Sequence, residues 1–300
     1  METDRAGDEG SPLSFTLSVL DIPGATVETF HPKAVHLYGN TLYVANDAPG
    51  HYSLEVFDVS SGNVRHVKSM VEWMNGDKKE TFAGEPNGVT RSYGKIYVTN
   101  TGSRTDVFDA ETYEFITCIG TGTWGEGGYQ TVHAFDVTAS QGAVFIRDKR
   151  KLVVVLEQDV QPGSAARVPI YSRSVNLQEA MGTYAVAARN DGFLYVTAQN
   201  KNIIYLFDPA DIRAGDTGFA PYLVTLGFEK SPQSIAFVGD RLFVTLRVDD
   251  KRSELWEISP KNGKLLQDFT DSMVYPEKIA GARHTLLVVD RATQTVKAIG

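Results

Sequence analysis

Cysteine is almost absent from this chain of 300 residues, which contains only Cys118. A single cysteine excludes an internal disulfide and any metal cluster built on several thiolates. Cys118 falls in a short, largely apolar segment, residues 115–119. Such a segment is typical of a buried outer strand, and we therefore interpret Cys118 as a packing residue rather than a nucleophile.

Long apolar runs and an excess of basic residues are also missing. No apolar stretch reaches the 18 residues or so that a transmembrane helix needs, so we expect no membrane-spanning segment. The chain has 29 Lys and Arg against 37 Asp and Glu, which gives a net charge of −8. Nucleic acids and anionic membranes are bound largely through a basic footprint, and the composition argues against both partners.

Familiar catalytic signatures are missing as well. The six histidines are scattered, and the chain has neither an HExxH motif nor a serine nucleophile elbow. No stretch sustains the period of an amphipathic helix, whereas short runs rich in β-branched and aromatic residues recur between turns. These patterns predict an all-β chain.

What the chain does contain is a sequence motif repeated six times. In its clearest copy, Pro86-Asn87-Gly88-Val89 leads into Lys95-Ile96-Tyr97-Val98-Thr99-Asn100 and then Thr105-Asp106-Val107-Phe108-Asp109. Aligning the copies on their first strand puts the equivalent positions at Pro32, Pro86, Val132, Gly182, Pro232 and Pro276. The spacings of 54, 46, 50, 50 and 44 residues suit the four-stranded blades of a β-propeller.

The two ends of the chain predict how the ring closes. The sixth copy stops after a third strand at Thr295–Ile299, and the missing fourth strand is supplied by Ser14–Leu20 near the N-terminus. Pairing these segments would hide two sheet edges that otherwise invite aggregation. We therefore predict a six-bladed β-propeller of four-stranded blades, closed by the N-terminal strand in the last blade.

The motif in residues 86–109 resembles the NHL-type propeller repeat, and the resemblance extends over nearly the whole chain from about residue 13. It implies the propeller fold but not one function, because similar propellers include scaffolds, sugar binders, lactonases and lyases.

Domain boundaries follow from the repeats and the start of the chain. Residues 1–12 form an acidic, glycine-containing leader that we expect to be disordered, and residues 13–300 form the propeller. The leader lacks the basic start and apolar core of a signal peptide. Together with a general likeness to envelope propellers of Gram-negative bacteria, it favours a periplasmic or envelope lipoprotein whose anchor has been removed. A cytoplasmic protein is the alternative.

One position in each copy combines polarity with complete divergence. The residue after the aligned first position is polar in all six copies and differs in each: Lys33, Asn87, His133, Thr183, Gln233 and Glu277. In a propeller these residues converge on the central axis. They predict a solvated channel mouth or a ligand-binding ring.

The loops after the second strands carry a disproportionate share of the basic residues, among them Arg104, Arg147, Arg150, Arg247 and Arg291. The planar fork of arginine suits bidentate binding of carboxylate, sulfate or phosphate. We predict a site for a small anion or an anionic saccharide on this face, with solvated surface loops as the alternative.

Oxygen-bearing residues end the second strand in four copies: Asn46, Asn100, Asp148 and Asp290. Such a ring would suit Ca²⁺, but Asn and Asp also close turns on their own backbone. The ring is broken by Ala198 and Leu246, so local caps are favoured and no cofactor is expected.

These patterns together favour a non-catalytic propeller that binds a small anionic or saccharide ligand, or another protein. The alternative is a carbohydrate lyase or lactonase, in which His133 at the axis acts as a base with Glu277 nearby.

Overall fold

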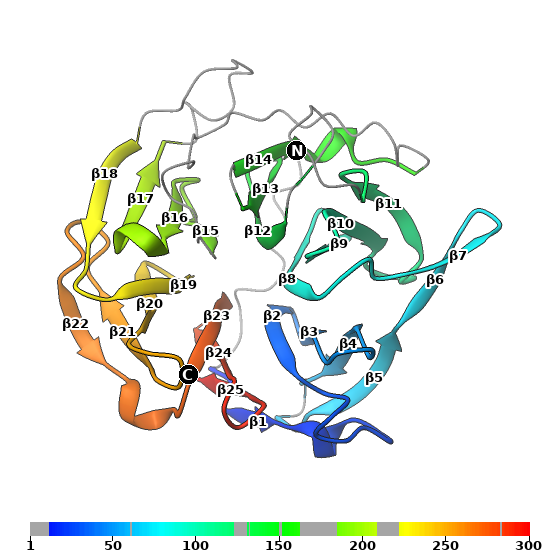
Figure 1. Ribbon diagram of the computed structural model, residues 1–300, viewed down its shortest axis with the longest axis horizontal. Helices are drawn as coiled ribbons and strands as arrows, with labels where there is room; N and C mark the ends of the chain where they lie inside the picture. The colour runs from blue at the N-terminus through cyan, green and yellow to red at the C-terminus, as the bar shows by residue number, and fades with distance from the viewer. Residues whose placement is uncertain are drawn as a thin grey trace.

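The computed structural model of the chain describes residues 12–60, 62–122, 131, 133–149, 152–162, 185–208, 222–282 and 284–300, with the backbone alone for 222–225. These residues form antiparallel sheets arranged as the blades of a propeller around a central axis (Figure 1). The expected all-β fold of six blades is confirmed.

The first three blades follow the chain in order. Blade 1 contains β2 (Pro32–Tyr38), β3 (Thr41–Asn46), β4 (Ser53–Asp58) and β5 (Arg65–Met70). Blade 2 contains β8 (Pro86–Ser92), β9 (Lys95–Asn100), β10 (Arg104–Asp109) and β11 (Phe115–Ile119). Blade 3 contains β12 (Ala134–Ser140), β13 (Ala143–Asp148) and β14 (Leu152–Leu156) within the described part of the chain.

The next two blades repeat the four-stranded meander. Blade 4 contains β15 (Val186–Ala188), β16 (Leu194–Ala198), β17 (Ile203–Phe207) and β18 (Tyr222–Gly227). Blade 5 contains β19 (Ser231–Val238), β20 (Arg241–Arg247), β21 (Ser253–Ile258) and β22 (Leu265–Asp268).

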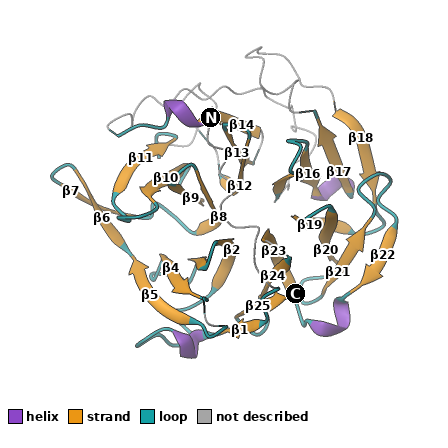
Figure 2. Cartoon of the chain, turned by 180° about the vertical axis from the view of Figure 1, so that it is seen from behind, coloured by secondary structure: helices purple, strands orange, loops and turns teal. Residues whose placement is uncertain are grey.

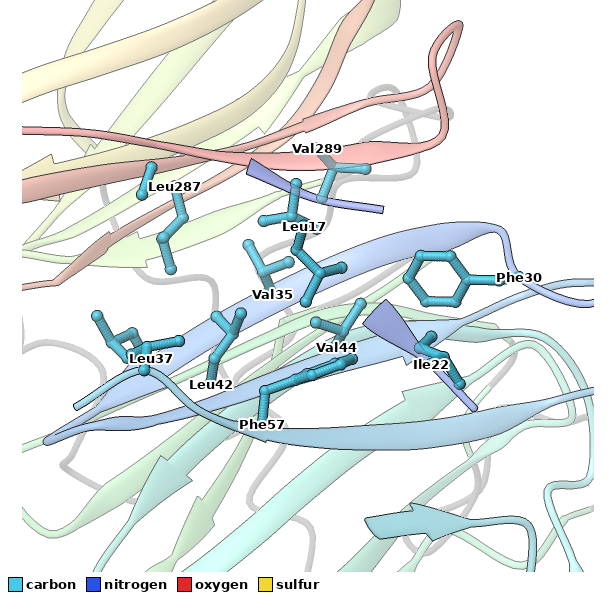
Figure 3. Packing of buried hydrophobic residues seen from close by; sticks show 13 residues of the cluster. Leu17, Ile22, Phe30, Val35, Leu37, Leu42, Val44, Phe57, Leu287 and Val289 are labelled. Carbon is cyan, nitrogen blue, oxygen red and sulfur yellow. The ribbon is translucent and has the colours of Figure 1, made fainter. Parts of the chain in front are cut away.

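Blade 6 draws its strands from both ends of the chain. It contains β23 (Pro276–Ala282), β24 (Thr285–Asp290) and β25 (Thr295–Ile299), and its outer strand is β1 (Phe15–Leu17). Leu17 pairs with Val296 and is fully buried between blades 6 and 1, against residues such as Val289, Val35 and Phe57 (Figure 3). The predicted closure by the N-terminal strand is confirmed.

Elements outside the blades are few in the described chain. A hairpin of β6 (Glu72–Asn75) and β7 (Lys78–Thr81) projects outward between blades 1 and 2 in both views (Figures 1 and 2). The helical elements are single 3₁₀ turns: η1 (Val19–Asp21), η2 (Glu157–Asp159), η4 (Gln199–Lys201) and η5 (Thr270–Ser272). None of the described helices is long and apolar enough to cross a membrane.

The repeated sequence motif produces this fold for two physical reasons. Second strands such as β9 are buried along almost their whole length because a neighbouring blade covers each face, and this requires an unbroken apolar run. The turn before β9 needs two left-handed residues, which are Tyr93 (φ 53°) and Gly94 (φ 71°). The first strands of neighbouring blades contact each other all the way round, from β2 through β23 and back to β2.

Candidate functional site

A β-bulge begins the innermost strand in blades 1, 2, 3, 5 and 6, the five blades in which this part of the chain is described. In each, the register between first and second strands skips one residue near the start of the first strand, and the skipped residues are Lys33, Asn87, Phe135, Gln233 and Glu277. A bulge of this kind re-aims a side chain. Four members of the predicted polar ring therefore occupy one structural position, at the same end of the axis.

Blade 3 departs from the predicted alignment. Its bulged residue is Phe135, because Ala134 pairs with Asp148 where blades 1, 2, 5 and 6 pair a proline with a residue at or near the end of the second strand. His133 lies two residues too early to occupy the bulge, and our register for it was wrong. Its carbonyl accepts a hydrogen bond from Lys149 N at 2.9 Å, and its ring stacks on Phe135 with centroids 6.1 Å apart. Thr183 lies outside the described residues.

The position after the bulge reveals a contact that sequence reasoning missed. Blades 1, 2 and 5 place a small residue there, but blade 3 has Asp136 and blade 6 has Lys278. These blades stand opposite each other in the ring, and Lys278 Nζ lies 3.3 Å from Asp136 Oδ1. A Cβ on Gly88 would lie 2.8 Å from the Asp136 Cα, so glycine is needed beside this bridge.

Burial shifts the pKa values of both members of this bridge. It raises the pKa of Asp136 and lowers the pKa of Lys278, while each partner acts against the shift of the other. Asp136 Oδ2 also accepts a hydrogen bond from Val186 N at 3.0 Å, which ties blade 4 to the same carboxylate. The innermost position of the ring is thus spanned by an ion pair.

Four charged side chains from blades 1 and 6 gather at the bulged end of the axis, and we call them the axial cluster: Lys33, Asp47, Glu277 and Arg291. Lys33 Nζ lies 2.9 Å from Glu277 Oε1 and 3.9 Å from Asp47 Oδ2, and Arg291 Nη1 lies 3.3 Å from Glu277 Oε1. Burial acts to raise the pKa of Glu277, but Lys33 and Arg291 outweigh it and hold that pKa below its ordinary value. Burial raises the pKa of Asp47, and Lys33 offsets this only in part.

Two amides occupy the corresponding bulges of blades 2 and 5. Gln233 Oε1 accepts a hydrogen bond from Ser253 Oγ at 3.0 Å. Asn87 is 5% exposed, and its buried Nδ2 has no hydrogen-bond partner among the described residues. Such an orphaned donor costs about 1–3 kcal/mol relative to a satisfied one. Asn87 therefore offers an unused donor at the end of the axis that carries the axial cluster.

The predicted basic loops are organised differently from our expectation. Arg104 begins β10, where its Nε lies 2.6 Å from Asp106 Oδ1 and its Nη1 lies 2.9 Å from Glu80 Oε2. Arg147 is fully buried within β13, its Nη2 donates to Lys149 O at 3.3 Å, and burial lowers its pKa to about 9. Neither residue belongs to an exposed loop.

The other predicted basic residues are less enclosed. Arg247, at the end of β20, forms an ion pair with Asp250. Arg291 is the one placed in the axial cluster, and its side chain is 63% exposed. Arg150 lies outside the described residues. Among the described members of this group, Arg291 is the one whose ion pair joins it to the polar ring.

Three of the four candidate metal ligands, Asn46, Asn100 and Asp290, form hydrogen bonds with nearby backbone groups. Asn46 Oδ1 accepts from His31 N and Ala48 N, and Nδ2 donates to Thr29 O, His51 O and Ser53 Oγ. Asn100 bonds to Gly102 N and Asp106, and Asp290 accepts from Val274 N and Tyr275 N. Asp148 is buried at the end of β13.

These contacts are of the kind that local caps make. The described residues hold no group of three or more His, Cys, Asp or Glu side chains placed to bind a metal.

Comparison with known proteins supports the assignment of the fold. No protein-family profile matches the sequence, and no curated protein matches it. The β-propeller domain of Cps50 (Swd1) from Myceliophteria thermophila is similar in structure, with a TM-score of 0.56 and 11% identity over 92% of this chain and 99% of that one. A catalytically inactive virginiamycin B lyase from Staphylococcus aureus, solved with quinupristin, gives a TM-score of 0.59 and 12% identity over 95% of this chain and 98% of that one. At these identities both likenesses show the β-propeller fold alone.

Proposed function

We propose that this chain is a non-catalytic ligand-binding propeller that holds a small anionic saccharide at the axial cluster. The observation that carries the proposal is the convergence of two cations, two carboxylates and the unused amide of Asn87 at one end of the axis. A neighbouring protein that presents the same chemistry is the alternative occupant. An envelope location stays a prediction from the sequence.

The balance of charge in the axial cluster favours a polyhydroxylated ligand over a bare anion. A hydroxyl group both donates and accepts, so it bonds equally well to Lys33 and to Glu277. A bare anion would meet Asp47 and Glu277 as well as the two cations, and it would be repelled by both carboxylates.

Arg291 supports the anionic character of the ligand. Its exposed guanidinium is tied to Glu277 by one contact of 3.3 Å, so the other nitrogens are open to a ligand. The guanidinium fork suits a carboxylate that it binds with two parallel hydrogen bonds. A uronate would combine this contact with hydroxyl groups for Lys33 and Asn87.

A lyase or lactonase is the second candidate, and one structural neighbour is by name a lyase. The geometry gives it less support. His133, its expected base, lies outside the bulge position and stacks on Phe135. Glu277, its expected partner, binds Lys33 and Arg291 instead.

The proposal is tested by thermal unfolding in the presence of glucuronate and galacturonate, with glucose as the neutral comparison. A ligand at about 100 times its Kd stabilises the folded chain by about 2.7 kcal/mol, which is readily seen as a rise in Tm. We expect both uronates to raise Tm, glucose to do so less, and Arg291→Gln and Asn87→Leu each to remove most of the rise.

Arg241→Gln is the matched control, because Arg241 is also a half-exposed arginine paired with a glutamate, Glu257, but begins its second strand at the far end of the blade. It should leave the uronate response intact. No response to either uronate, or an equal response in all variants, would exclude the axial site. Turnover of a lactone or uronate polymer that depends on His133 would establish the enzyme instead.

A further inference from the structure

The guanidinium of Arg91 lies on the ring of Tyr38, with 3.5 Å between Arg91 Cζ and the ring centroid. Arg91 is near the end of β8 and Tyr38 ends β2, so the contact joins blades 1 and 2. Both residues lie beside the turns that lead to the second strands, because Arg91 pairs with Ile96 and Tyr38 with Thr41. The contact is therefore at the opposite end of these strands from the axial cluster.

Arg91 has no acidic partner in the described part of the chain. No described carboxylate lies within ion-pair distance of its guanidinium, and its buried Nη1 has no hydrogen-bond acceptor there. Arg104, on β10 of the same blade, shows the usual arrangement, since it meets the carboxylates of Asp106 and Glu80. A buried donor on a charged group is costly when it is unsatisfied, so a missing acceptor at Arg91 calls for an occupant.

Further groups around Arg91 are also suited to an anion. The phenols of Tyr43 and Tyr113 are close enough that the Arg91 charge lowers their pKa values, although burial acts in the opposite direction and dominates. A second cation, Lys68 of β5, lies over the Tyr113 ring with Nζ 5.0 Å from its centroid. We call these residues the Arg91 cluster: Tyr38, Tyr43, Lys68, Arg91 and Tyr113.

The cluster concentrates positive charge on a chain whose net charge is −8. Two cations and three tyrosines meet there, and neither cation forms an ion pair with a described carboxylate. The Tyr38 ring holds the guanidinium plane in place, which reduces the entropy lost when an anion binds.

We propose that the Arg91 cluster is a binding site for a small oxyanion, a carboxylate, sulfate or phosphate group, separate from the axial cluster. Two oxygens of the group accept hydrogen bonds from Arg91, and Lys68 supplies a second, more exposed positive charge. The site lies at the other end of the propeller blades, so its occupation does not depend on the saccharide site proposed above.

The experiment compares the Tm of the wild type and Arg91→Gln in sodium acetate, sulfate and phosphate, against sodium chloride at the same ionic strength. Sulfate and phosphate stabilise most proteins non-specifically, so the informative quantity is the difference between the two proteins. We expect the oxyanion that fits best to raise the wild-type Tm more than that of Arg91→Gln. In chloride alone, Arg91→Gln should equal or exceed the wild type in stability, because it removes the unsatisfied charge.

Binding is measured directly by titrating the Arg91 Nε–Hε resonance of the wild-type protein, assigned by its loss in Arg91→Lys. We expect Lys68→Gln to weaken this binding about two- to fivefold, as for an exposed charge. Arg91→Gln has no such resonance, so its loss of binding is measured by the comparison of Tm values above. Arg65→Gln is the control, since Arg65 is an exposed arginine of the same outer strand as Lys68 and pairs with Asp58. The proposal fails if the resonance does not move with any of the three anions, or if Lys68→Gln and Arg65→Gln titrate alike.

Discussion

Lys278 and Asp136 meet across the centre of the ring, with Nζ 3.3 Å from Oδ1, although their blades stand on opposite sides of the axis. Both side chains are largely buried. Strand pairing connects residues within a blade and apolar packing connects neighbouring blades, whereas this contact connects blades 3 and 6 directly. It therefore links two blades that no strand pairing or apolar cluster of the described residues joins.

The first prediction concerns this bridge. Lys278→Met leaves the Asp136 carboxylate buried without its partner, and we expect it to lower the free energy of unfolding by about 3–5 kcal/mol. The double variant Lys278→Met with Asp136→Asn should recover much of the loss, because neither buried charge remains. Urea unfolding of the two single variants and the double variant gives the coupling energy.

A surface pair gives the comparison for that cycle. Lys79 and Glu72 lie 2.6 Å apart on the projecting hairpin, but both side chains are more than half exposed. Solvent screens such a pair, so its coupling energy should be close to zero. Similar coupling in the two pairs would show that the bridge across the axis contributes no more than a surface contact.

The second prediction concerns closure of the ring. Leu17 on β1 is fully buried in the cluster between blades 6 and 1, whereas its neighbour Thr16 faces solvent. We expect Leu17→Ala to lower the free energy of unfolding by about 2–5 kcal/mol. Thr16→Ala should change it little, and the midpoints of urea unfolding measure both. Equal midpoints for the two variants would mean that β1 is dispensable for closure.

The third prediction separates a cap from a calcium ligand. The Asn46 amide bonds to backbone groups of His31, Ala48, Thr29 and His51. Asn46→Ala leaves several of these groups unsatisfied and should cost about 2–4 kcal/mol. Because the side chain is fully engaged, millimolar Ca²⁺ should leave the Tm of the wild type unchanged. A rise in Tm with Ca²⁺ that Asn46→Ala abolishes would restore the metal hypothesis.

The blades were predictable because their signals are local. An unbroken apolar run marks a strand covered on both faces, and residues that accept positive φ mark the turns, as at Gly94. Closure followed from counting, since the last copy lacked one strand and the N-terminal segment supplied it.

The register of blade 3 was predictable in principle but was missed. In blades 1, 2, 5 and 6 the proline of the first strand pairs with the residue fourteen positions later, at or near the end of the second strand. Counting back from Asp148 by the same interval gives Ala134, and so places Phe135 at the bulge. We aligned on Val132 instead, because no proline marks the copy.

The charged contacts depended on geometry that no single repeat encodes. Lys278 interrupts a row of small residues, which is a visible signal, but its partner is identified only once blades 3 and 6 are known to face each other. The sequence did not indicate which arginines could bind an anion. Arg104 and Arg147 are enclosed, whereas Arg91 has no acidic partner among the described residues.

The last prediction is a pH dependence of stability that originates at Asp106. This carboxylate is fully buried beside Arg104 and Asn100. Burial raises its pKa to about 7, from an ordinary value of 3.8, against the opposing effect of Arg104. The folded chain then holds a proton that the unfolded chain releases, so this group's contribution is full below about pH 4 and is lost as the pH rises to about 7.

We therefore expect the unfolding free energy of the wild type, relative to Asp106→Asn, to fall by about 1–3 kcal/mol between pH 5 and pH 8, measured in urea. Asp109 on the same strand is the matched control. Hydrogen bonds from the backbone N–H groups of Thr112 and Glu111 lower its pKa, so it is ionised in both states throughout this range. Asp109→Asn should change stability equally at both pH values. A wild-type difference from Asp106→Asn that stays constant would mean that Arg104 keeps Asp106 ionised, because a permanently charged group contributes no pH dependence.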